Sequence, residues 1–83
     1  MHEYSLVQAM FDQIEGVVAA QRARSVRRVR VRIGTQAGVE PTLFQTAYDI
    51  FRVKTVCDDA PLQIVAVDGS DELVLDQLEL EVP

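Results

Sequence analysis

A chain of 83 residues with 48% apolar residues and few glycines and prolines has the composition of one small packed domain, residues 1–83. No apolar run approaches the ~20 residues of a membrane span. Acidic and polar residues also interrupt the N-terminus too early for a signal peptide. The single cysteine, Cys57, excludes an internal disulfide and fits a reducing compartment. We therefore expect a soluble, cytoplasmic domain.

Charge is unevenly distributed along the chain, whose net charge is −5. Six of the eight basic residues lie between Arg22 and Arg32, whereas the last 26 residues carry eight acids and no base. Such asymmetry can mark a nucleic-acid surface. The overall acidity and the lack of interleaved aromatic residues argue against that interpretation. We favour pairing of the basic and acidic segments within the fold, and expect no nucleic-acid partner.

The first three residues, Met1-His2-Glu3, form a candidate metal site. An α-amine, two backbone amides and an imidazole lie close together there and can surround a small divalent metal with four nitrogens. A square-planar nitrogen set indicates Ni(II) or Cu(II). His2 is the single histidine of the chain. The alternative is that His2 is a solvated residue in a frayed terminus.

A first helix is predicted over residues 5–21. Ser5 and Gln8 have the spacing of a capping box, which would start the helix at Ser5. His2 would then precede the helix N-terminus on a short tether. A wide apolar face is predicted to pack inward, and its members are Leu6, Val7, Met10, Phe11, Ile14, Val17 and Val18.

Two segments alternate strictly between apolar and charged residues, as half-buried strands do. Residues 28–33 alternate arginine with valine or isoleucine, and residues 78–82 alternate glutamate with leucine or valine. Pairing these strands would place arginines opposite glutamates, with each pair contributing roughly 0.2–1 kcal/mol.

A second helix is predicted from Pro41 to about residue 53, because proline suits the first helical position. Glu40 stands at its entrance, where the helix macrodipole stabilises a carboxylate by ~0.3–1 kcal/mol. A second strand is predicted over residues 62–67, followed by a turn at 68–71 and a last strand over 72–82. The inward phase of the last strand shifts near Asp76-Gln77, which predicts a bulge.

The order helix, strand, helix, strand, strand predicts an α/β fold. A parallel strand–helix–strand unit followed by a hairpin gives a two-layer domain with a three-stranded mixed sheet and two helices on one face.

Blocks along nearly the whole chain resemble the HypA/HybF family of nickel metallochaperones. The matching blocks are MHEYSL at 1–6, VRIG at 31–34, EPTLF at 40–44, TVCDDAPLQIV at 55–65, GSDEL at 69–73 and LELE at 78–81.

This resemblance implies a carrier that binds Ni(II) at its N-terminus for [NiFe]-hydrogenase maturation, or for urease in some organisms. It implies two partners, a nickel-insertion GTPase and the hydrogenase large subunit. His2 corresponds to the nickel-binding histidine, and the Met1 amine with the His2 and Glu3 backbone nitrogens completes the nitrogen set. Glu40 falls where the family can place an acid near the site, so its oxygen is a candidate axial ligand.

The sequence departs from the family pattern at one point. The family carries a zinc module with two Cys-x-x-Cys pairs between the second strand and the last, whereas this junction is residues 67–71 here. One cysteine cannot supply a four-thiolate zinc site, so no structural zinc is expected. Either the module was removed by design, which the undisturbed flanking strands favour, or this is a natural variant without it. Its loss exposes a strand edge, so a homodimer by strand exchange is a hypothesis.

No catalytic constellation is present, since there is no second histidine and no glycine-rich phosphate loop. We therefore expect a carrier rather than an enzyme. The alternative interpretation is a metal-free interaction module of the same fold. Cys57 is expected to be a small, partly buried side chain.

Overall fold

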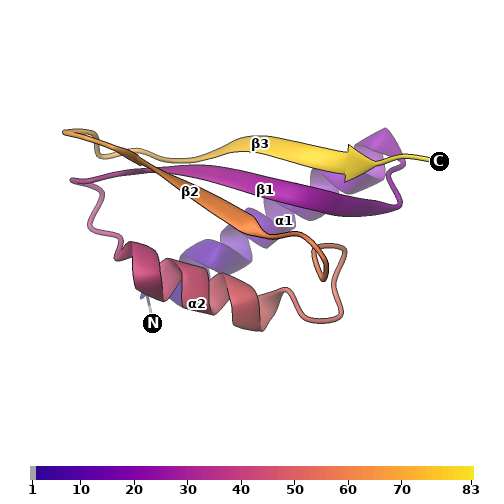
Figure 1. Ribbon diagram of the computed structural model, residues 1–83, viewed down its shortest axis with the longest axis horizontal. Helices are drawn as coiled ribbons and strands as arrows, with labels where there is room; N and C mark the ends of the chain where they lie inside the picture. The colour runs from indigo at the N-terminus through magenta and orange to yellow at the C-terminus, as the bar shows by residue number, and fades with distance from the viewer. Residues whose placement is uncertain (1) are drawn as a thin grey trace.

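The structure is a computed structural model that describes residues 2–83 (Figure 1). Its elements, in chain order, are α1 (His2–Gln21), β1 (Ser25–Gly34), α2 (Pro41–Phe51), β2 (Leu62–Val67) and β3 (Leu73–Glu81). None of the helices within residues 2–83 is long and apolar enough to cross a membrane.

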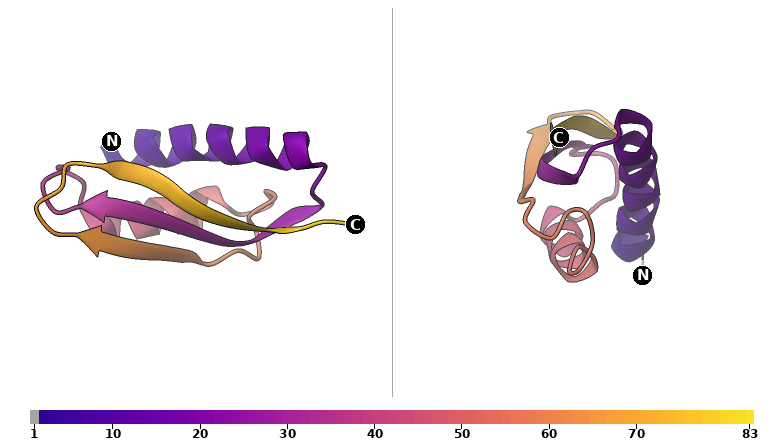
Figure 2. Two further views of the ribbon diagram at one scale, coloured as in Figure 1. Left: turned by 90° about the horizontal axis from the view of Figure 1, so that it is seen from above. Right: turned by 90° about the vertical axis from the view of Figure 1, so that its right-hand side faces the viewer.

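The three strands form one mixed sheet in the order β2-β1-β3. β1 pairs in parallel with β2, where Val31 lies opposite Ile64, and antiparallel with β3, where Ile33 lies opposite Leu73. β1 is thus the central strand, and α2 provides the crossover that the parallel pair requires. The predicted two-layer α/β fold with a three-stranded mixed sheet and two helices is confirmed (Figures 1 and 2).

The core lies between the sheet and the two helices. Alternate residues of β1 are buried from Val29 to Ile33, as the strand pattern predicts, and the buried hydrophobic residues of β1 are Val26, Val29, Val31 and Ile33. The same cluster contains residues of α1, such as Phe11 and Ile14, and residues of α2, such as Phe44 and Tyr48. Both helices therefore pack on the same face of the sheet.

The first helix begins earlier than predicted. α1 starts at His2, so Ser5 lies inside the helix and the predicted capping box is wrong. Tertiary contacts explain the added turn. The Glu3 carboxylate accepts a hydrogen bond from the Glu40 backbone N–H at 3.2 Å, and the Tyr4 ring lies 5.6 Å from that of Phe51. An acidic residue in the first turn also favours the helix through the macrodipole.

The predicted bulge is confirmed at Asp76. The register of β3 against β1 shifts between the pairs Arg30–Gln77 and Val31–Leu75, which leaves Asp76 as the extra residue. The Asp76 carboxylate bridges two arginines, with Oδ2 at 2.7 Å from Arg30 Nε and Oδ1 at 2.9 Å from an Arg32 guanidinium nitrogen.

The predicted pairing of residues 28–33 with residues 78–82 is confirmed, but the ion pairs differ from the expected ones. Arg28 lies opposite Glu79 in the register, but the ion pairs of β1 within the described chain go to Asp76 and Glu72. The bulge explains the difference, because it turns the Asp76 carboxylate toward Arg30 and Arg32. These arginine side chains are about two-fifths exposed, so each pair contributes ~0–1 kcal/mol.

The β2–β3 turn closes against the end of β1. The Gln36 N–H donates to the Ser70 carbonyl oxygen at 2.8 Å, and the Thr35 N–H donates to that of Val67 at 3.0 Å. A Cβ added at Gly34 would lie 2.0 Å from the Ser70 carbonyl oxygen, so this position requires glycine. The junction at residues 67–71, where the sequence predicts the missing module, is therefore a tightly bonded turn.

Candidate metal centre

The backbone of the candidate site belongs to the first turn of α1, which begins at His2. Met1 and the His2 side chain, two of the predicted sources of metal ligands, lie outside the described part of the structure. The described backbone still constrains the site. A helical ladder does not use the amide hydrogens of its own first turn, so forming α1 does not occupy the nitrogens on which the predicted chelate depends.

Helical backbone at His2 also brings consecutive nitrogens together. A five-membered chelate ring through the nitrogens of residues 2 and 3 requires a ψ angle at His2 near zero. The helical ψ is about −42°, whereas the extended ψ is about +135° and turns these nitrogens apart. Because His2 is helical, its backbone is closer to the chelating geometry than a strand-like terminus would be.

Glu3 is held against the second helix. Its side chain is largely buried, with 8% of its surface exposed, and its Oε2 accepts the hydrogen bond from the Glu40 N–H. This bond joins the first turn of α1 to the residue that begins α2, across 37 positions of sequence. Glu3 thus anchors the candidate site to the folded domain.

Glu40 is the N-cap residue of α2. Its backbone is extended, with φ −85° and ψ 114°, and its carboxylate accepts hydrogen bonds from the backbone amides of Thr42 and Leu43. The predicted role of Glu40 at the helix entrance is confirmed in this form. The structure brings Glu40 next to Glu3, as the predicted site requires. Nickel ligation by Glu40 stays a prediction.

The cap leaves part of the Glu40 carboxylate available. Oε2 makes the shorter contacts, at 3.1 Å from the Thr42 nitrogen and 3.4 Å from that of Leu43. Oε1 makes one contact, at 3.4 Å from the Thr42 nitrogen. Because a carboxylate has about four lone-pair sites, Oε1 keeps the capacity to approach a cation while Oε2 caps the helix.

Side chains elsewhere in the described chain do not build a metal site. Within residues 2–83, as far as they are described, no group of three or more His, Cys, Asp or Glu side chains is placed to hold a metal ion.

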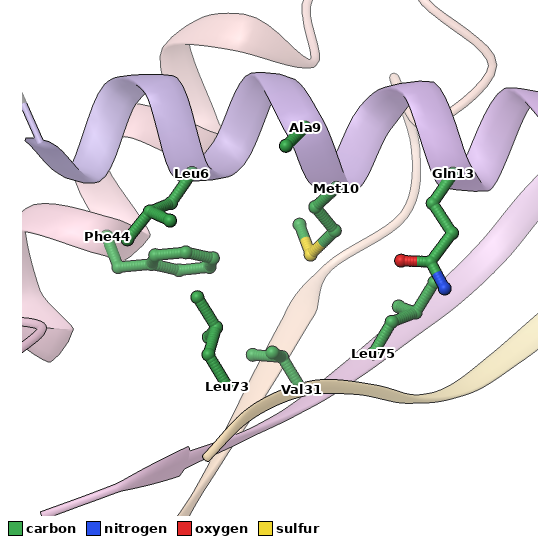
Figure 3. A pocket seen from close by; sticks show the side chains of 8 residues that line it. All are labelled: Leu6, Ala9, Met10, Gln13, Val31, Phe44, Leu73 and Leu75. Atoms are coloured by element: carbon green, nitrogen blue, oxygen red, sulfur yellow. The ribbon is translucent and has the colours of Figure 1, made fainter. Parts of the chain in front are cut away.

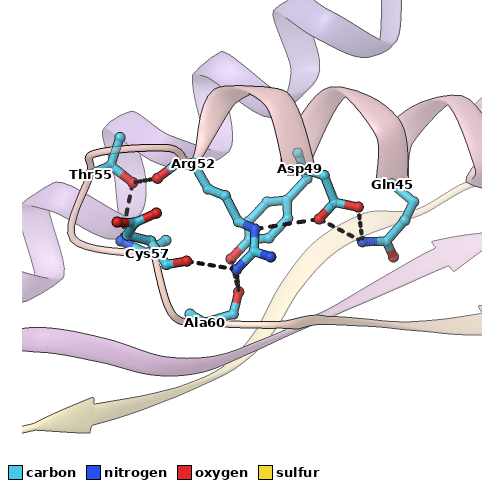
Figure 4. Close-up of polar contacts among 8 residues, drawn as sticks. Gln45, Asp49, Arg52, Thr55, Cys57 and Ala60 are labelled. Carbon is cyan, nitrogen blue, oxygen red and sulfur yellow. Dashed lines mark hydrogen bonds and ion pairs between the residues drawn. The ribbon is translucent and has the colours of Figure 1, made fainter.

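A second polar cluster, which the sequence did not predict, lies at the C-terminal end of α2 (Figure 4). The Tyr48 hydroxyl donates to the Ala60 carbonyl oxygen at 2.6 Å. Arg52 donates to the same oxygen at 3.3 Å and to the Asp58 carbonyl oxygen at 2.9 Å, and it lies 5.8 Å above the Tyr48 ring. Tyr48 in the last turn of α2 and Arg52 just after it carry no sequence signal for such bonds, because the carbonyls belong to a loop whose path the pattern does not show.

Cys57 belongs to this cluster. It is fully buried rather than partly buried as predicted, and its backbone N–H donates to the Thr55 hydroxyl oxygen at 3.1 Å (Figure 4). Burial raises the pKa of the Cys57 thiol, against a smaller lowering by the hydrogen bond with Tyr48. Burial likewise raises the pKa of the Tyr48 hydroxyl. A neutral, buried thiol is a structural group rather than a metal ligand.

The fold and this site define a class of protein: a small α/β domain in which two neighbouring carboxylates, Glu3 and Glu40, join a helical N-terminus to the start of the second helix. A family model described as hydrogenase/urease nickel incorporation, metallochaperone, HypA, matches residues 1–72. The hydrogenase maturation factor HypA of Shewanella oneidensis is 39% identical over 90 aligned positions, which cover 100% of this chain and 76% of that protein. The chain therefore belongs to the HypA family of nickel metallochaperones, and the predicted resemblance is confirmed.

Other relatives extend this comparison. The hydrogenase maturation factor HypA of Aquifex aeolicus is 42% identical over 62 positions, covering 75% of this chain and 54% of that protein. The solution structure of the Ni metallochaperone HypA from Helicobacter pylori superposes with a TM-score of 0.81 over 98% of both chains, at 23% identity. At that identity the superposition shows the fold alone. It includes β3, which the family-model match does not reach.

Proposed function

We propose that this chain binds Ni(II) through four nitrogens at its N-terminus: the Met1 amine, the His2 backbone nitrogen and imidazole, and the Glu3 backbone nitrogen. The observation that carries the proposal is that α1 begins at His2. Helical backbone there turns the nitrogens of residues 2 and 3 to the same side, and the helical ladder does not use their hydrogens.

Charge balance supports the same ligand set. The N-terminus of a helix carries a partial positive charge, which disfavours a bare cation. Binding through two amide nitrogens displaces two protons, so the chelate that forms around Ni(II) carries no net charge from the metal and these amides. The Glu3 carboxylate, fixed against the Glu40 N–H, places a further negative group at this end of α1.

Glu40 is proposed as a weak axial donor. Its Oε1, the less engaged of the two oxygens, would approach the metal while Oε2 continues to cap α2. This arrangement couples metal binding to the hydrogen bond between α1 and α2, because the Glu40 backbone N–H is the donor to Glu3.

The proposed role in the cell is to carry nickel rather than to catalyse a reaction. A planar set of ligands on an exposed terminus leaves the metal accessible to an acceptor, which suits transfer. The acceptors we propose are the hydrogenase large subunit, with a nickel-insertion GTPase as partner, in the cytoplasm. Membership of a family described by nickel incorporation into hydrogenase and urease supports this role.

The test is a Ni(II) titration followed by calorimetry and visible absorption at mildly alkaline pH. The intact chain should bind one nickel with the yellow absorption of a planar nitrogen complex. His2→Ala and a chain with one glycine added before Met1 should each lose at least about tenfold in affinity, because each removes or displaces a ligand.

The control adds one glycine after Pro83 and should bind nickel as the intact chain does. Circular dichroism should be unchanged in every variant. Stoichiometric, unweakened nickel binding by the N-terminally extended chain would refute the terminal chelate. Absence of nickel binding by the intact chain would instead favour the metal-free interaction module.

A further inference from the structure

β3 is an edge strand with a hydrogen-bonding side exposed. In the order β2-β1-β3 it has β1 as its one neighbour among the described strands. The Gly34 N–H donates to the Glu72 carbonyl oxygen at 2.8 Å, so residues 34 and 72 form a hydrogen-bonded pair. Such pairs alternate along an antiparallel ladder. The backbone N–H and C=O groups of Leu73 and Leu75 therefore point away from β1.

An apolar groove lies next to this exposed edge, between α1 and β3 (Figure 3). Its volume is about 150 Å³, enough for an apolar group the size of a benzene ring. Leu6 and Met10 of α1 point into it toward Leu73 and Leu75 of β3, as Figure 3 shows. Its remaining lining residues are Ala9, Gln13, Val31 and Phe44.

The groove exists because α1 does not fully cover the inner side of β3. The inward leucines of β3, which are Leu73, Leu75, Leu78 and Leu80, are all half-buried, whereas the inward residues of β1 are buried. On α1 the groove is bordered by Ala9, which has a short side chain and is exposed. The apolar groove therefore opens to solvent beside the unpaired edge of β3.

The edge strand itself carries exposed acidic residues on its outer face, with Arg28 of β1 opposite one of them, Glu79. Glu79 and Glu81 are exposed on β3, and their carboxylates make no ion pair among residues 2–83, in contrast to Glu72 and Asp76. A strand beside β3 would thus meet apolar groups on its inner side and carboxylates on its outer side.

We propose that β3 is a docking edge for an extended segment of a partner protein in which apolar and basic residues alternate. The segment would add to β3 as a fourth strand, with its main chain bonded to Leu73 and Leu75. Its apolar side chains would enter the groove, and its basic side chains would face Glu79 and Glu81. This proposal goes beyond nickel binding and does not depend on it.

A second copy of the chain is a poorer occupant. Antiparallel pairing of β3 with β3 of another molecule along residues 78–82 would place Glu79 of one copy opposite Glu81 of the other, and like charges on neighbouring strands are destabilising. The strand of this chain that has the alternating basic pattern is β1, which is already the central strand of the sheet.

The test uses a dye-labelled synthetic peptide of alternating lysine and valine, as long as the nine residues of β3. Fluorescence anisotropy should show binding to the intact chain, and a peptide with glutamate in place of lysine should bind at least about tenfold more weakly. Amide hydrogen exchange should slow at Leu73 and Leu75 when the lysine peptide binds. Sedimentation of the chain alone should give a monomer.

The matched variants place a phenylalanine on α1 in two positions. Ala9→Phe fills the groove and should weaken the lysine peptide about tenfold. Ala19→Phe, on the exposed side of the same helix, should bind it as the intact chain does. If Ala9→Phe does not fold, the hydrogen-exchange measurement on the intact chain decides whether the lysine peptide binds at β3. Equal binding by both variants, protection at residues 62–67 instead of Leu73 and Leu75, a dimer of the chain alone, or no peptide binding would each overturn the proposal.

Discussion

The two ends of α2 are built in opposite ways. At the N-terminal end, Glu40 caps the helix, and a hydrogen bond of 3.2 Å from the Glu40 N–H to Glu3 joins α2 to α1. At the C-terminal end, Tyr48 and Arg52 converge on the Ala60 carbonyl oxygen, and Cys57 is fully buried beside them. The first end presents carboxylates near backbone nitrogens, and the second buries the Tyr48 hydroxyl and the Cys57 thiol beneath the Arg52 guanidinium.

Polar groups therefore have two different roles in this small domain: they fix a loop at one end of α2, and they leave an oxygen available at the other. Bonds at the C-terminal end hold the loop between α2 and β2 in place. At the N-terminal end, Glu40 keeps one oxygen with a single long contact, which leaves it able to meet a cation. We therefore expect changes at the two ends to affect different measurements, metal affinity at one and folding stability at the other.

The largest expected contrast is in nickel affinity as pH rises. If two amide protons leave for each nickel bound, affinity should rise by about 100-fold per pH unit once the amine and imidazole are already deprotonated, and more steeply at lower pH, where they must release their protons too. Calorimetry in buffers of different ionisation enthalpy measures the number of protons released. A release of one proton or none would contradict ligation by both backbone nitrogens.

At the C-terminal end of α2, the quantity that changes in alkali is stability, and it should fall as the pH rises. Burial raises the pKa of Tyr48 above its ordinary 10.0 and that of Cys57 above 9.0. Between these ordinary values and the raised ones, the unfolded chain loses protons that the folded chain keeps. The free energy of unfolding should therefore fall above about pH 9, by up to ~1.4 kcal/mol per pH unit for each group.

Urea unfolding at several pH values measures this slope. Cys57→Ala removes one of the two titrating groups, so it should reduce this slope by up to ~1.4 kcal/mol per pH unit. The nickel affinity of this variant should equal that of the intact chain. A free energy of unfolding that is constant up to pH 11 would show that the two groups titrate alike in the folded and unfolded chains.

Removing the Tyr48 hydroxyl should lower the free energy of unfolding without changing nickel affinity. Tyr48→Phe deletes the 2.6 Å hydrogen bond to the Ala60 carbonyl oxygen, which still accepts from Arg52. The expected loss is about 1–2 kcal/mol. Tyr4→Phe is the matched control, since the Tyr4 ring packs on Phe51 and is 41% exposed, and it should change stability little. Equal losses in both variants would contradict a special role for the buried hydroxyl.

At the other end of α2, Glu40 variants separate helix capping from metal ligation. Glu40→Ala removes the acceptor of the Thr42 and Leu43 amides and should cost ~0.5–2 kcal/mol of stability. Glu40→Gln keeps an acceptor oxygen and should cost less. If the carboxylate is an axial donor, both variants should weaken nickel several-fold. Unchanged nickel affinity in both would leave Glu40 as a cap alone.

The sequence pattern predicted the fold, and the family resemblance implied that Glu40 lies near the N-terminal site, but neither predicted the contacts that depend on three-dimensional neighbours. Strict alternation in residues 28–33 and the phase shift at Asp76 are local signals, and they placed β1 and the bulge correctly. The start of α1 was missed because its added turn depends on Glu40 and Phe51, which are distant in sequence. A capping pattern at Ser5 cannot reveal these contacts.

The same reason explains the arginine pairs and the C-terminal cluster. Asp76 bridges Arg30 and Arg32 because a bulge turns it toward them, and a pattern of alternating charges does not specify which acid a bulge brings close. The hydrogen bond of the Tyr48 hydroxyl was missed because its acceptor is the backbone carbonyl of a loop residue, Ala60. Every residue has a backbone carbonyl, so the sequence does not show which one accepts.

The smallest effect is expected from Asp49, which lies at the edge of the C-terminal cluster. It contacts Arg52 at 3.4 Å and accepts from Gln45 at 3.3 Å, but its side chain is 49% exposed (Figure 4). Exposed pairs at helical spacing contribute ~0.2–0.5 kcal/mol. Asp49→Ala should therefore lower the free energy of unfolding by no more than about 0.5 kcal/mol, less in high salt. A loss as large as that of Tyr48→Phe would mean that Asp49 positions Arg52 on the loop carbonyls, and that the cluster begins one turn earlier in α2.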